Sequence, residues 1–239
     1  MCWGRSLRAF AGWNMRLQSN FVVIATRNEG KVKEFAKLFE PKGYKVRSLA
    51  DYCELPEIVE SGTTFAENAR IKAQIISAHL HVPVLADDSG LCVAALDGAP
   101  GVYSARFAGE DATDEANNAK LLQALREKAA QGALPAAEAQ AGLQGGAAEH
   151  PALLSEAAFV CALALIDPVA NEMIEAEGRC EGFIIGEARG DGGFGYDPLF
   201  YIPALQKTMA QLTVDEKNEM SHRAKALRKF LDRLPDPDQ

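Results

Sequence analysis

Residues 82–90, Val-Pro-Val-Leu-Ala-Asp-Asp-Ser-Gly, join a short apolar run to two adjacent carboxylates. An apolar run of this length that ends at turn residues is typical of a buried strand. Residues 21–25, Phe-Val-Val-Ile-Ala, form a second such run and are followed by polar residues. We expect the strand of residues 82–86 to end before Asp87 and Asp88, which places both carboxylates at its carboxyl end.

Helical patterns follow these strands along the chain. Residues 30–40 carry a one-sided apolar face, and a capping box made by Thr64 and Glu67 opens a helix that extends to about Leu80. Another helix begins at Asp114, where acidic side chains favour a first turn. The last helix follows a capping box made by Thr213 and Glu216 and carries an apolar stripe of Met220, Ala224, Leu227, Leu231 and Leu234.

Further strands are expected at residues 44–49, 157–166, 172–185 and 198–202. Strands and helices alternate without a strict strand-helix-strand rhythm. The pattern therefore predicts an α/β protein with a mixed sheet rather than a doubly wound parallel one.

Length, net charge and cysteine content exclude several classes of function. A chain of 239 residues can form one large domain or two small lobes without structural staples. Its formal charge of −8 argues against binding a nucleic acid polymer, which needs a basic face, but one nucleotide needs only a few lysines and a metal ion. No apolar run is long enough to cross a bilayer, so no membrane contact is expected. Five scattered cysteines without a C-x-x-C pair indicate reduced thiols and a cytoplasmic location.

Two segments fall outside the expected domain of residues 21–234. Residues 1–20 hold three arginines and no acid, which suits a transit peptide, although we favour a start at Met15 and an N-terminal tail. Residues 129–150 contain nine alanines and no aromatic or β-branched residue. We expect a low-complexity surface insertion at about 129–155 with no part in the chemistry.

A polar hexapeptide, Thr26-Arg27-Asn28-Glu29-Gly30-Lys31, lies between the first strand and the first helix. Backbone N–H groups at a helix start, together with Asn28 and the Lys31 ammonium, can cradle phosphates. A plain turn with an N-cap asparagine explains the same residues equally well. The segment is no Walker A loop, because Ala25 and Val32 occupy positions where that motif needs glycine and Ser or Thr.

The Asp87-Asp88-Ser89-Gly90 segment presents hard oxygen ligands without a neighbouring cysteine or histidine ligand. Such ligands suit magnesium or manganese rather than zinc. Glu60 is the best candidate for a further carboxylate, and one carboxylate free of the metal could take the proton of an attacking water. An Asp-rich turn that caps local amides is the alternative, and the position after a buried strand favours the metal site.

The segment Gly190–Gly195 matches the dinucleotide-binding pattern G-x-G-x-x-G by letter. That interpretation needs a helix to follow, and Pro198 opposes one. The remaining interpretation is a glycine loop that presents Phe194 and Tyr196 for a base to stack on. Core packing is the alternative for aromatic residues in general, and we expect it for Phe200 and Tyr201.

The segment Lys217 to Arg223 places charged groups beside the apolar stripe of the last helix. His222 and Arg223 point away from that stripe. A solvated helix face is the usual explanation, whereas donors in a cleft would recognise acceptor oxygens on a base.

Five stretches together resemble the inosine triphosphate pyrophosphatase family, also described as dITP/XTP pyrophosphatases. They occur in family order between Phe21 and about Leu234, and Arg27, the tail and the insertion depart from the family pattern. The stretches are ATRNEGKVKEF, ESGTTFAENARIKA, VLADDSGLCVAALDGAPGVYSARFAG, GGFGYDPLF and EKNEMSHRAKAL.

The resemblance implies an elongated, two-lobed α/β fold around a long mixed β-sheet with flanking helices and a nucleotide cleft between the lobes. It also implies a homodimer and a Mg²⁺ cofactor, for which Mn²⁺ could substitute. The implied reaction cleaves ITP, dITP or XTP between the α and β phosphates, which yields a monophosphate and pyrophosphate and keeps deaminated bases out of DNA and RNA.

The resemblance also implies roles for individual residues. Thr26, Arg27, Asn28, Glu29, Gly30, Lys31 and Lys72 would hold the phosphates. Glu60 and Asp88 would bind the metal with support from Asp87, Asp88 would accept the proton of the water, and Ser89 would contact substrate. Phe194, Gly195, Tyr196 and Asp197 would sandwich the base, Lys217 would brace Asp197, and His222 and Arg223 would donate to the 6-oxo group.

This assignment has a chemical rationale, because adenine presents an amino donor where inosine presents an oxo acceptor. GTP also carries a 6-oxo group, so its rejection needs another feature of the pocket. Two alternatives stay open: a pyrophosphatase for other abnormal nucleotides such as modified pyrimidines, and a nucleotide sensor without catalysis. The leading interpretation requires carboxylates at the strand end and ammonium groups from two helices to converge on one metal-bridged triphosphate.

Overall fold

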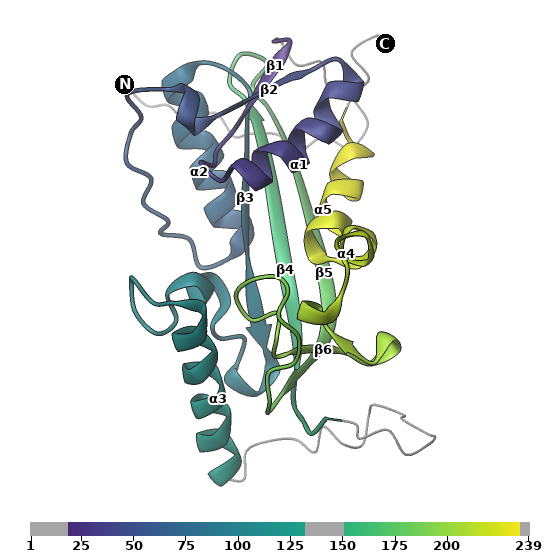
Figure 1. Ribbon diagram of the computed structural model, residues 1–239. Helices are drawn as coiled ribbons and strands as arrows, with labels where there is room; N and C mark the ends of the chain where they lie inside the picture. The colour runs from purple at the N-terminus through teal and green to yellow at the C-terminus, as the bar shows by residue number, and fades with distance from the viewer. Residues whose placement is uncertain (1–18, 132–150, 235–239) are drawn as a thin grey trace. The chain divides into compact units, whose positions relative to one another are not determined.

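The computed structural model describes residues 19–131 and 151–234, and Figure 1 labels their main elements. Most of the expected tail and most of the expected insertion lie outside these residues. The strands are β1 (Phe21–Ile24), β2 (Lys45–Ser48), β3 (Val84–Val93), β4 (Leu153–Asp167), β5 (Glu172–Ile185), β6 (Phe200–Ile202) and β7 (Lys207–Thr208). The α-helices are α1 (Glu29–Phe39), α2 (Phe65–Leu80), α3 (Asp114–Ala130), α4 (Val214–Met220) and α5 (His222–Leu231).

The described strands form one seven-stranded sheet in the order β2-β1-β3-β4-β5-β6-β7. Strand β1 pairs in parallel with β2 and β3, whereas β5, β6 and β7 pair antiparallel. The prediction of an α/β protein with a mixed sheet and flanking helices is therefore confirmed.

The chain clusters into two compact units. The first comprises Met1–Asp88, Ala162–Glu177 and Ala226–Gln239, and the second comprises Ser89–Cys161 and Gly178–Lys225. Strands β3, β4 and β5 contribute residues to both units, because the division falls within each of them.

Each unit has its own apolar core. In the first, Ile76 of α2 packs with Val23 of β1 and Val84 of β3, all fully buried. In the second, Leu121 and Leu125 of α3 belong to a larger cluster. Other members of that cluster include Leu91, Val93, Phe159, Ile184 and Phe200.

The capping boxes predicted from sequence are confirmed. The hydroxyl of Thr64 accepts a hydrogen bond from the Glu67 N–H at 3.2 Å, and Thr213 caps α4 through Glu216 with the same geometry. Each cap satisfies an N–H group that has no partner inside its helix, which fixes where the helix begins.

Two boundary predictions are wrong. Strand β3 does not end at Ala86 but continues to Val93, because Leu91 and Val93 beyond the polar residues are fully buried and hold the chain extended. The last helix is broken in two, since Ser221 adopts an extended conformation with ψ 158° between α4 and α5. The buried residues of α5 are Ala226, Leu227 and Phe230, whereas Met220, Ala224 and Leu231 of the expected stripe are half-buried.

None of the helices in the described part of the chain is both long enough and apolar enough to span a bilayer. The four cysteines within the described residues, Cys53, Cys92, Cys161 and Cys180, form no disulfide with one another.

Candidate active site

The polar segment between β1 and α1 begins a helix and also presents a lysine. Asn28 caps α1, because its side-chain oxygen accepts a hydrogen bond from the Lys31 N–H at 3.1 Å. The Thr26 hydroxyl in turn accepts from the Asn28 N–H at 3.2 Å. The N-cap interpretation of this segment is therefore confirmed, and its phosphate-binding role stays a prediction.

The Lys31 side chain forms an ion pair with Asp87. Its Nζ lies 2.7 Å from Asp87 Oδ2, and the Asp87 side chain is only 3% exposed. The carboxylate is thus held by an ammonium group that enters from α1.

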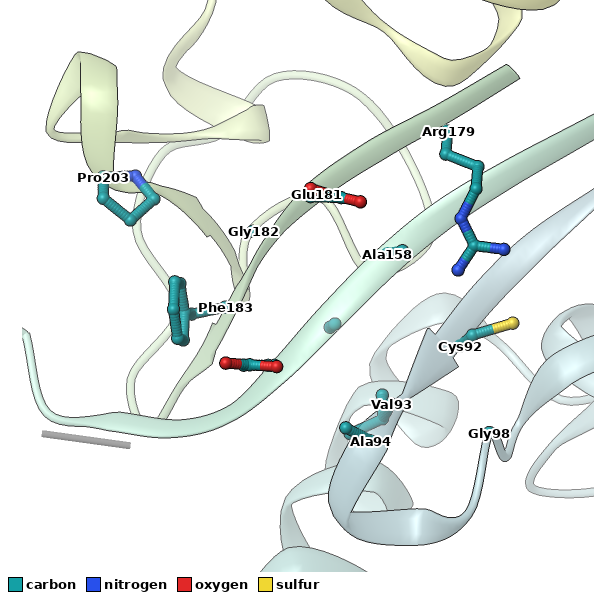
Figure 2. Close-up of a pocket in the computed structure, with 12 residues that line it drawn as sticks. Cys92, Val93, Ala94, Gly98, Ala158, Arg179, Glu181, Gly182, Phe183 and Pro203 are labelled. Atoms are coloured by element: carbon teal, nitrogen blue, oxygen red, sulfur yellow. The ribbon is translucent and has the colours of Figure 1, made fainter. Parts of the chain in front are cut away.

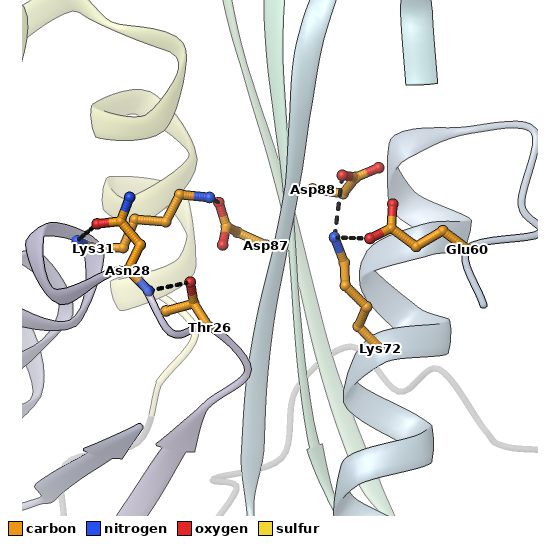
Figure 3. Close-up of polar contacts among 7 residues, drawn as sticks. All are labelled: Thr26, Asn28, Lys31, Glu60, Lys72, Asp87 and Asp88. Carbon is orange, nitrogen blue, oxygen red and sulfur yellow. Dashed lines mark hydrogen bonds and ion pairs between the residues drawn. The ribbon is translucent and has the colours of Figure 1, made fainter. Parts of the chain in front are cut away.

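A second cluster joins Glu60, Lys72 and Asp88. Lys72 Nζ, from α2, lies 3.2 Å from Asp88 Oδ1 and 3.3 Å from Glu60 Oε1. Figure 3 shows this cluster on one side of β3 and the Lys31–Asp87 pair on the other. Successive side chains of a strand point to opposite faces, and this explains the separation.

The structure divides the expected charged residues into two groups. It brings Lys72 to Asp88 and Lys31 to Asp87, but Lys31 and Asp88 lie on different sides of β3 (Figure 3). The expectation assumed that the strand ended before Asp87, in which case the two carboxylates could turn to the same side. Because β3 runs through both residues, their side chains point to opposite faces, and the convergence of both groups on one metal-bridged triphosphate stays a prediction.

The environment of Asp88 suits a proton acceptor. Burial raises the pKa of this carboxyl above its usual value, the nearby Lys72 ammonium lowers it, and the Glu60 carboxylate raises it. The net effect is a raised pKa, which brings a carboxyl group closer to the pH at which a general base works best.

The carboxylates in this cluster also suit a hard divalent cation. Asp88 Oδ2 is buried and has no hydrogen-bond partner among the described residues. No group of three or more His, Cys, Asp or Glu side chains in residues 19–131 and 151–234 could hold a metal ion. Magnesium commonly needs only one or two protein carboxylates beside water and substrate phosphates, so Glu60 and Asp88 fit this ion.

Asn68 is a residue of this cluster that the sequence reasoning missed. It is fully buried on α2, and its Oδ1 accepts a hydrogen bond from the Gly62 N–H at 2.8 Å. Burial is the main influence on the pKa of Asp88 and raises it, and the Asn68 amide is among the groups that lower it. Its position one helical turn before Lys72, on the same face, was the available signal.

The glycine loop of the second unit presents one aromatic ring rather than two. Phe194 is 67% exposed, whereas Tyr196 is 3% exposed and its hydroxyl donates to the Ser104 carbonyl at 2.8 Å. The expectation that both rings are presented is therefore wrong, because Tyr196 packs in the core. No helix follows the loop, since the next regular element is β6, and Phe200 and Tyr201 are core residues as expected.

Asp197 connects this loop to α4. Its Oδ2 lies 2.9 Å from Lys217 Nζ and accepts a hydrogen bond from the Phe194 N–H at 3.3 Å. Burial raises the pKa of Asp197, and the hydrogen bond from Lys217 opposes this shift. The contact between Lys217 and Asp197 implied by the family resemblance is thus present.

His222 and Arg223 begin α5 and are both half-buried. The His222 ring stacks on Phe159 with 5.1 Å between the ring centroids. These side chains therefore do not form a fully solvated face. Ser89 is half-buried on β3.

A pocket of about 570 Å³ lies elsewhere in the second unit (Figure 2). Cys92, Glu156, Arg179, Glu181, Phe183 and Pro203 are among the residues that line it. None of the site residues predicted from the sequence lines this pocket.

A mixed sheet with flanking helices, and carboxylates paired with lysines around one strand, define the class of this protein as α/β with a charged candidate site. The Ham1 family model matches residues 22–143 and 135–233. The chain belongs to the Ham1 family.

Curated relatives agree over most of the chain. A dITP/XTP pyrophosphatase of Bacillus anthracis is 46% identical over 216 residues, which are 90% of this chain and 96% of the relative. A dITP/XTP pyrophosphatase of Geobacillus kaustophilus (strain HTA426) is 48% identical over 209 residues, which are 87% of this chain and 91% of the relative.

Solved structures show the same fold. The Ham1 protein of Staphylococcus aureus matches with a TM-score of 0.74 and 37% identity over 90% of this chain and 97% of its own. A HAM1 protein from Coxiella burnetii matches with a TM-score of 0.74 and 37% identity over 90% of this chain and 98% of its own.

Proposed function

We propose that this protein hydrolyses non-standard purine nucleoside triphosphates such as ITP, dITP and XTP between the α and β phosphates. The products are a nucleoside monophosphate and pyrophosphate. The curated relatives described above are named for this activity, and they cover about nine-tenths of the chain. The observation that carries the proposal is the cluster in which Lys72 lies within 3.3 Å of both Glu60 and Asp88.

Asp88 is the proposed proton acceptor. Hydrolysis of a phosphoanhydride requires a water to lose a proton as it attacks phosphorus, and a carboxylate with a raised pKa is a suitable base. Burial raises the pKa of Asp88, and Lys72 opposes this rise because its ammonium lies 3.2 Å from the carboxylate. The same ammonium is available to a phosphate oxygen.

Glu60 and Asp88 are the proposed ligands of Mg²⁺, with Mn²⁺ as a possible substitute and Asp87 in a supporting role. When bound, the ion supplies neutralisation of phosphate charge and acidification of a coordinated water. Lys31 and the N–H groups at the start of α1 are the proposed further phosphate contacts, along with Thr26, Arg27, Asn28, Glu29, Gly30 and Ser89.

Residues of the second unit are proposed to recognise the base. The exposed ring of Phe194 offers a stacking surface, and Lys217 fixes Asp197 behind it. His222 and Arg223 are the proposed donors to the 6-oxo group. A site that pairs donors with an oxo acceptor penalises ATP, whose amino group would leave those donors unpaired. We further propose a nucleotide cleft, a homodimer and a cytoplasmic location.

Product analysis of wild type and Asp88→Asn tests this proposal. Wild-type protein with ITP and Mg²⁺ is expected to give IMP and pyrophosphate, and Asp88→Asn is expected to lower turnover roughly 10²–10⁴-fold, the usual worth of a general base. Asp97→Asn, at an exposed aspartate in the second unit, is the matched control and should keep wild-type turnover. Release of IDP and phosphate, or normal turnover in Asp88→Asn, would refute the proposed reaction or the proposed role.

A further inference from the structure

Two side chains of helix α3 make hydrogen bonds to the backbone of Gly195 in the glycine loop, one to its N–H and one to its carbonyl. Asp114 Oδ2, in the first turn of α3, accepts a hydrogen bond from the Gly195 N–H at 2.6 Å. Asn118 Nδ2, one turn further along α3, donates to the Gly195 carbonyl at 2.9 Å. All three residues belong to the second unit. The helix therefore satisfies both the donor and the acceptor of a single loop residue.

The spacing of the two helix residues explains how they reach the same target. Residues four apart lie on the same face of an α-helix. The Thr113 hydroxyl accepts from the Ala116 N–H at 3.2 Å and so fixes where α3 begins. The first turn is thereby oriented with Asp114 and Asn118 towards the loop.

Asp197 and Tyr196 anchor the loop on one side, but side-chain packing at Phe194 and Gly195 adds little restraint. Gly195 has φ +60°, and an added Cβ there would meet no heavy atom within 4 Å. The Phe194 ring is 67% exposed and so gains little from packing. A flexible loop would pay ordering entropy whenever it bound a ligand, and restraint before binding removes that cost.

The chemistry of the two contacts suits a positioning role. The Asp114 carboxylate gives a short, charge-assisted hydrogen bond, which is stronger than one between neutral groups. Asn118 Oδ1 is buried without a hydrogen-bond partner among the described residues. An unsatisfied buried acceptor is costly, and a site that tolerates it commonly has a functional reason.

We propose that Asp114 and Asn118 are positioning residues that hold Phe194 and its loop in the conformation that binds the purine base. The inference rests on the proposed function, because the loop is the proposed reader of the base. It adds two residues of α3 that act on base affinity through the Gly195 peptide without touching the reacting phosphates.

The test compares Asp114→Ala and Asn118→Ala with Glu115→Ala. Glu115 is the matched control, since it is also acidic, exposed and in the first turn of α3, whereas the hydrogen bonds from α3 to Gly195 come from Asp114 and Asn118. For Asp114→Ala we expect KM for ITP to rise roughly ten- to a hundredfold, the worth of a hydrogen bond to a charged group. We expect kcat to change less than about threefold in all three variants, and Asp114→Asn, which keeps an acceptor, to recover part of the loss.

Hydrogen exchange at the Gly195 N–H gives a readout that does not depend on activity. Asp114→Ala should expose this amide to exchange, whereas Glu115→Ala should leave its protection at the wild-type level. Equal effects of the two variants on KM and on exchange would overturn the inference. Wild-type protein that is inactive on every purine triphosphate would instead refute the proposed function, and the exchange comparison would still decide the role of α3.

Discussion

Asp87 and Asp88 are neighbours in the chain, yet their carboxylates pair with ammonium groups from different helices on different sides of β3 (Figure 3). Two adjacent carboxylates on an extended strand avoid mutual repulsion in this way, because each gains its own lysine. The arrangement separates the Lys31–Asp87 pair from a cluster in which Asp88 Oδ2 has no hydrogen-bond partner among the residues that the structure describes. We therefore expect the Lys31–Asp87 pair to contribute more to stability, and the proposed proton acceptor lies in the second cluster.

Removing the Lys31 ammonium should destabilise the fold. The Asp87 side chain is 3% exposed, and a buried carboxylate that loses its ammonium is strongly disfavoured. Lys31 is itself 27% exposed, so we expect Lys31→Met to lower the free energy of unfolding by about 2 kcal/mol rather than the full cost of a buried pair. Urea denaturation measures this change.

An exposed pair on the same helix is the control for that experiment. Lys33 lies 3.9 Å from Glu29, and both side chains are more than three-quarters exposed. Lys33→Met should change the free energy of unfolding by less than about 0.5 kcal/mol. An equal decrease in the free energy of unfolding in both lysine variants would show that the Lys31–Asp87 pair stabilises the fold no more than an exposed pair does.

Gly193→Ala should damage base binding. Gly193 has φ +85°, and an added Cβ would overlap Asp197 and lie 2.5 Å from Lys217 Nζ. The methyl group would thus separate the ion pair that braces the loop, and we expect KM for ITP to rise about tenfold, which corresponds to about 1.4 kcal/mol. Steady-state kinetics with ITP measures this.

The matched control is Gly98→Ala. Gly98 has φ +89°, but an added Cβ there would meet nothing within 4 Å. This variant carries the left-handed backbone strain of about 1–2 kcal/mol without the overlap, so its KM should stay at the wild-type value. A rise in KM of similar size in both variants would contradict the specific role of the ion pair.

The stability contribution of Asp197 should depend on pH. Burial raises its pKa in the folded protein above the value of about 3.9 that aspartate has in an unfolded chain. The folded state then binds this proton more tightly, so the contribution of Asp197 to stability falls as pH rises from about 4 through the folded-state pKa. The stability of wild type minus that of Asp197→Asn should therefore decrease across this window in urea denaturation, and an increase would contradict the shift.

Asn68→Asp should impair metal binding without opening the Gly62 segment. The new carboxylate still accepts from the Gly62 N–H, but it replaces an amide donor near Asp88 with a negative charge. We expect the Mg²⁺ concentration that gives half-maximal turnover to rise roughly 10–100-fold, the range for residues that contact metal ligands from outside. Gln74→Glu adds the same charge at an exposed position of α2 and should leave this concentration unchanged.

Sequence patterns were sufficient to predict those helices and strands whose positions depend on neighbouring residues. Capping boxes at Thr64 and Thr213 placed two helix starts, and apolar runs placed β1 and the beginning of β3. They were insufficient where contacts between residues far apart in the chain determine where an element ends. The polar residues at 87–90 look like a strand end, but the buried side chains of Leu91 and Val93 continue the strand.

The candidate site could likewise be predicted only in part from the sequence. Motifs identified the charged residues, and the contact of Lys217 with Asp197 followed from the family likeness, whereas the ion pair of Lys72 with Asp88 was not predicted. The side of β3 on which each carboxylate lies depends on whether the strand continues, so the sequence did not reveal that Asp87 and Asp88 pair with different lysines on different sides of it. Tyr196 could not be assigned to the core from its loop position, because its hydroxyl partner Ser104 lies far away in sequence.

Pyrophosphate release from ITP, XTP, GTP and ATP, with and without Mg²⁺, tests the central claim most directly. The proposed function requires rapid release of pyrophosphate from ITP and XTP with the metal ion, release from ATP slower by orders of magnitude, and little release without the ion. Absence of pyrophosphate from ITP, or equal rates with ITP and ATP, would contradict it.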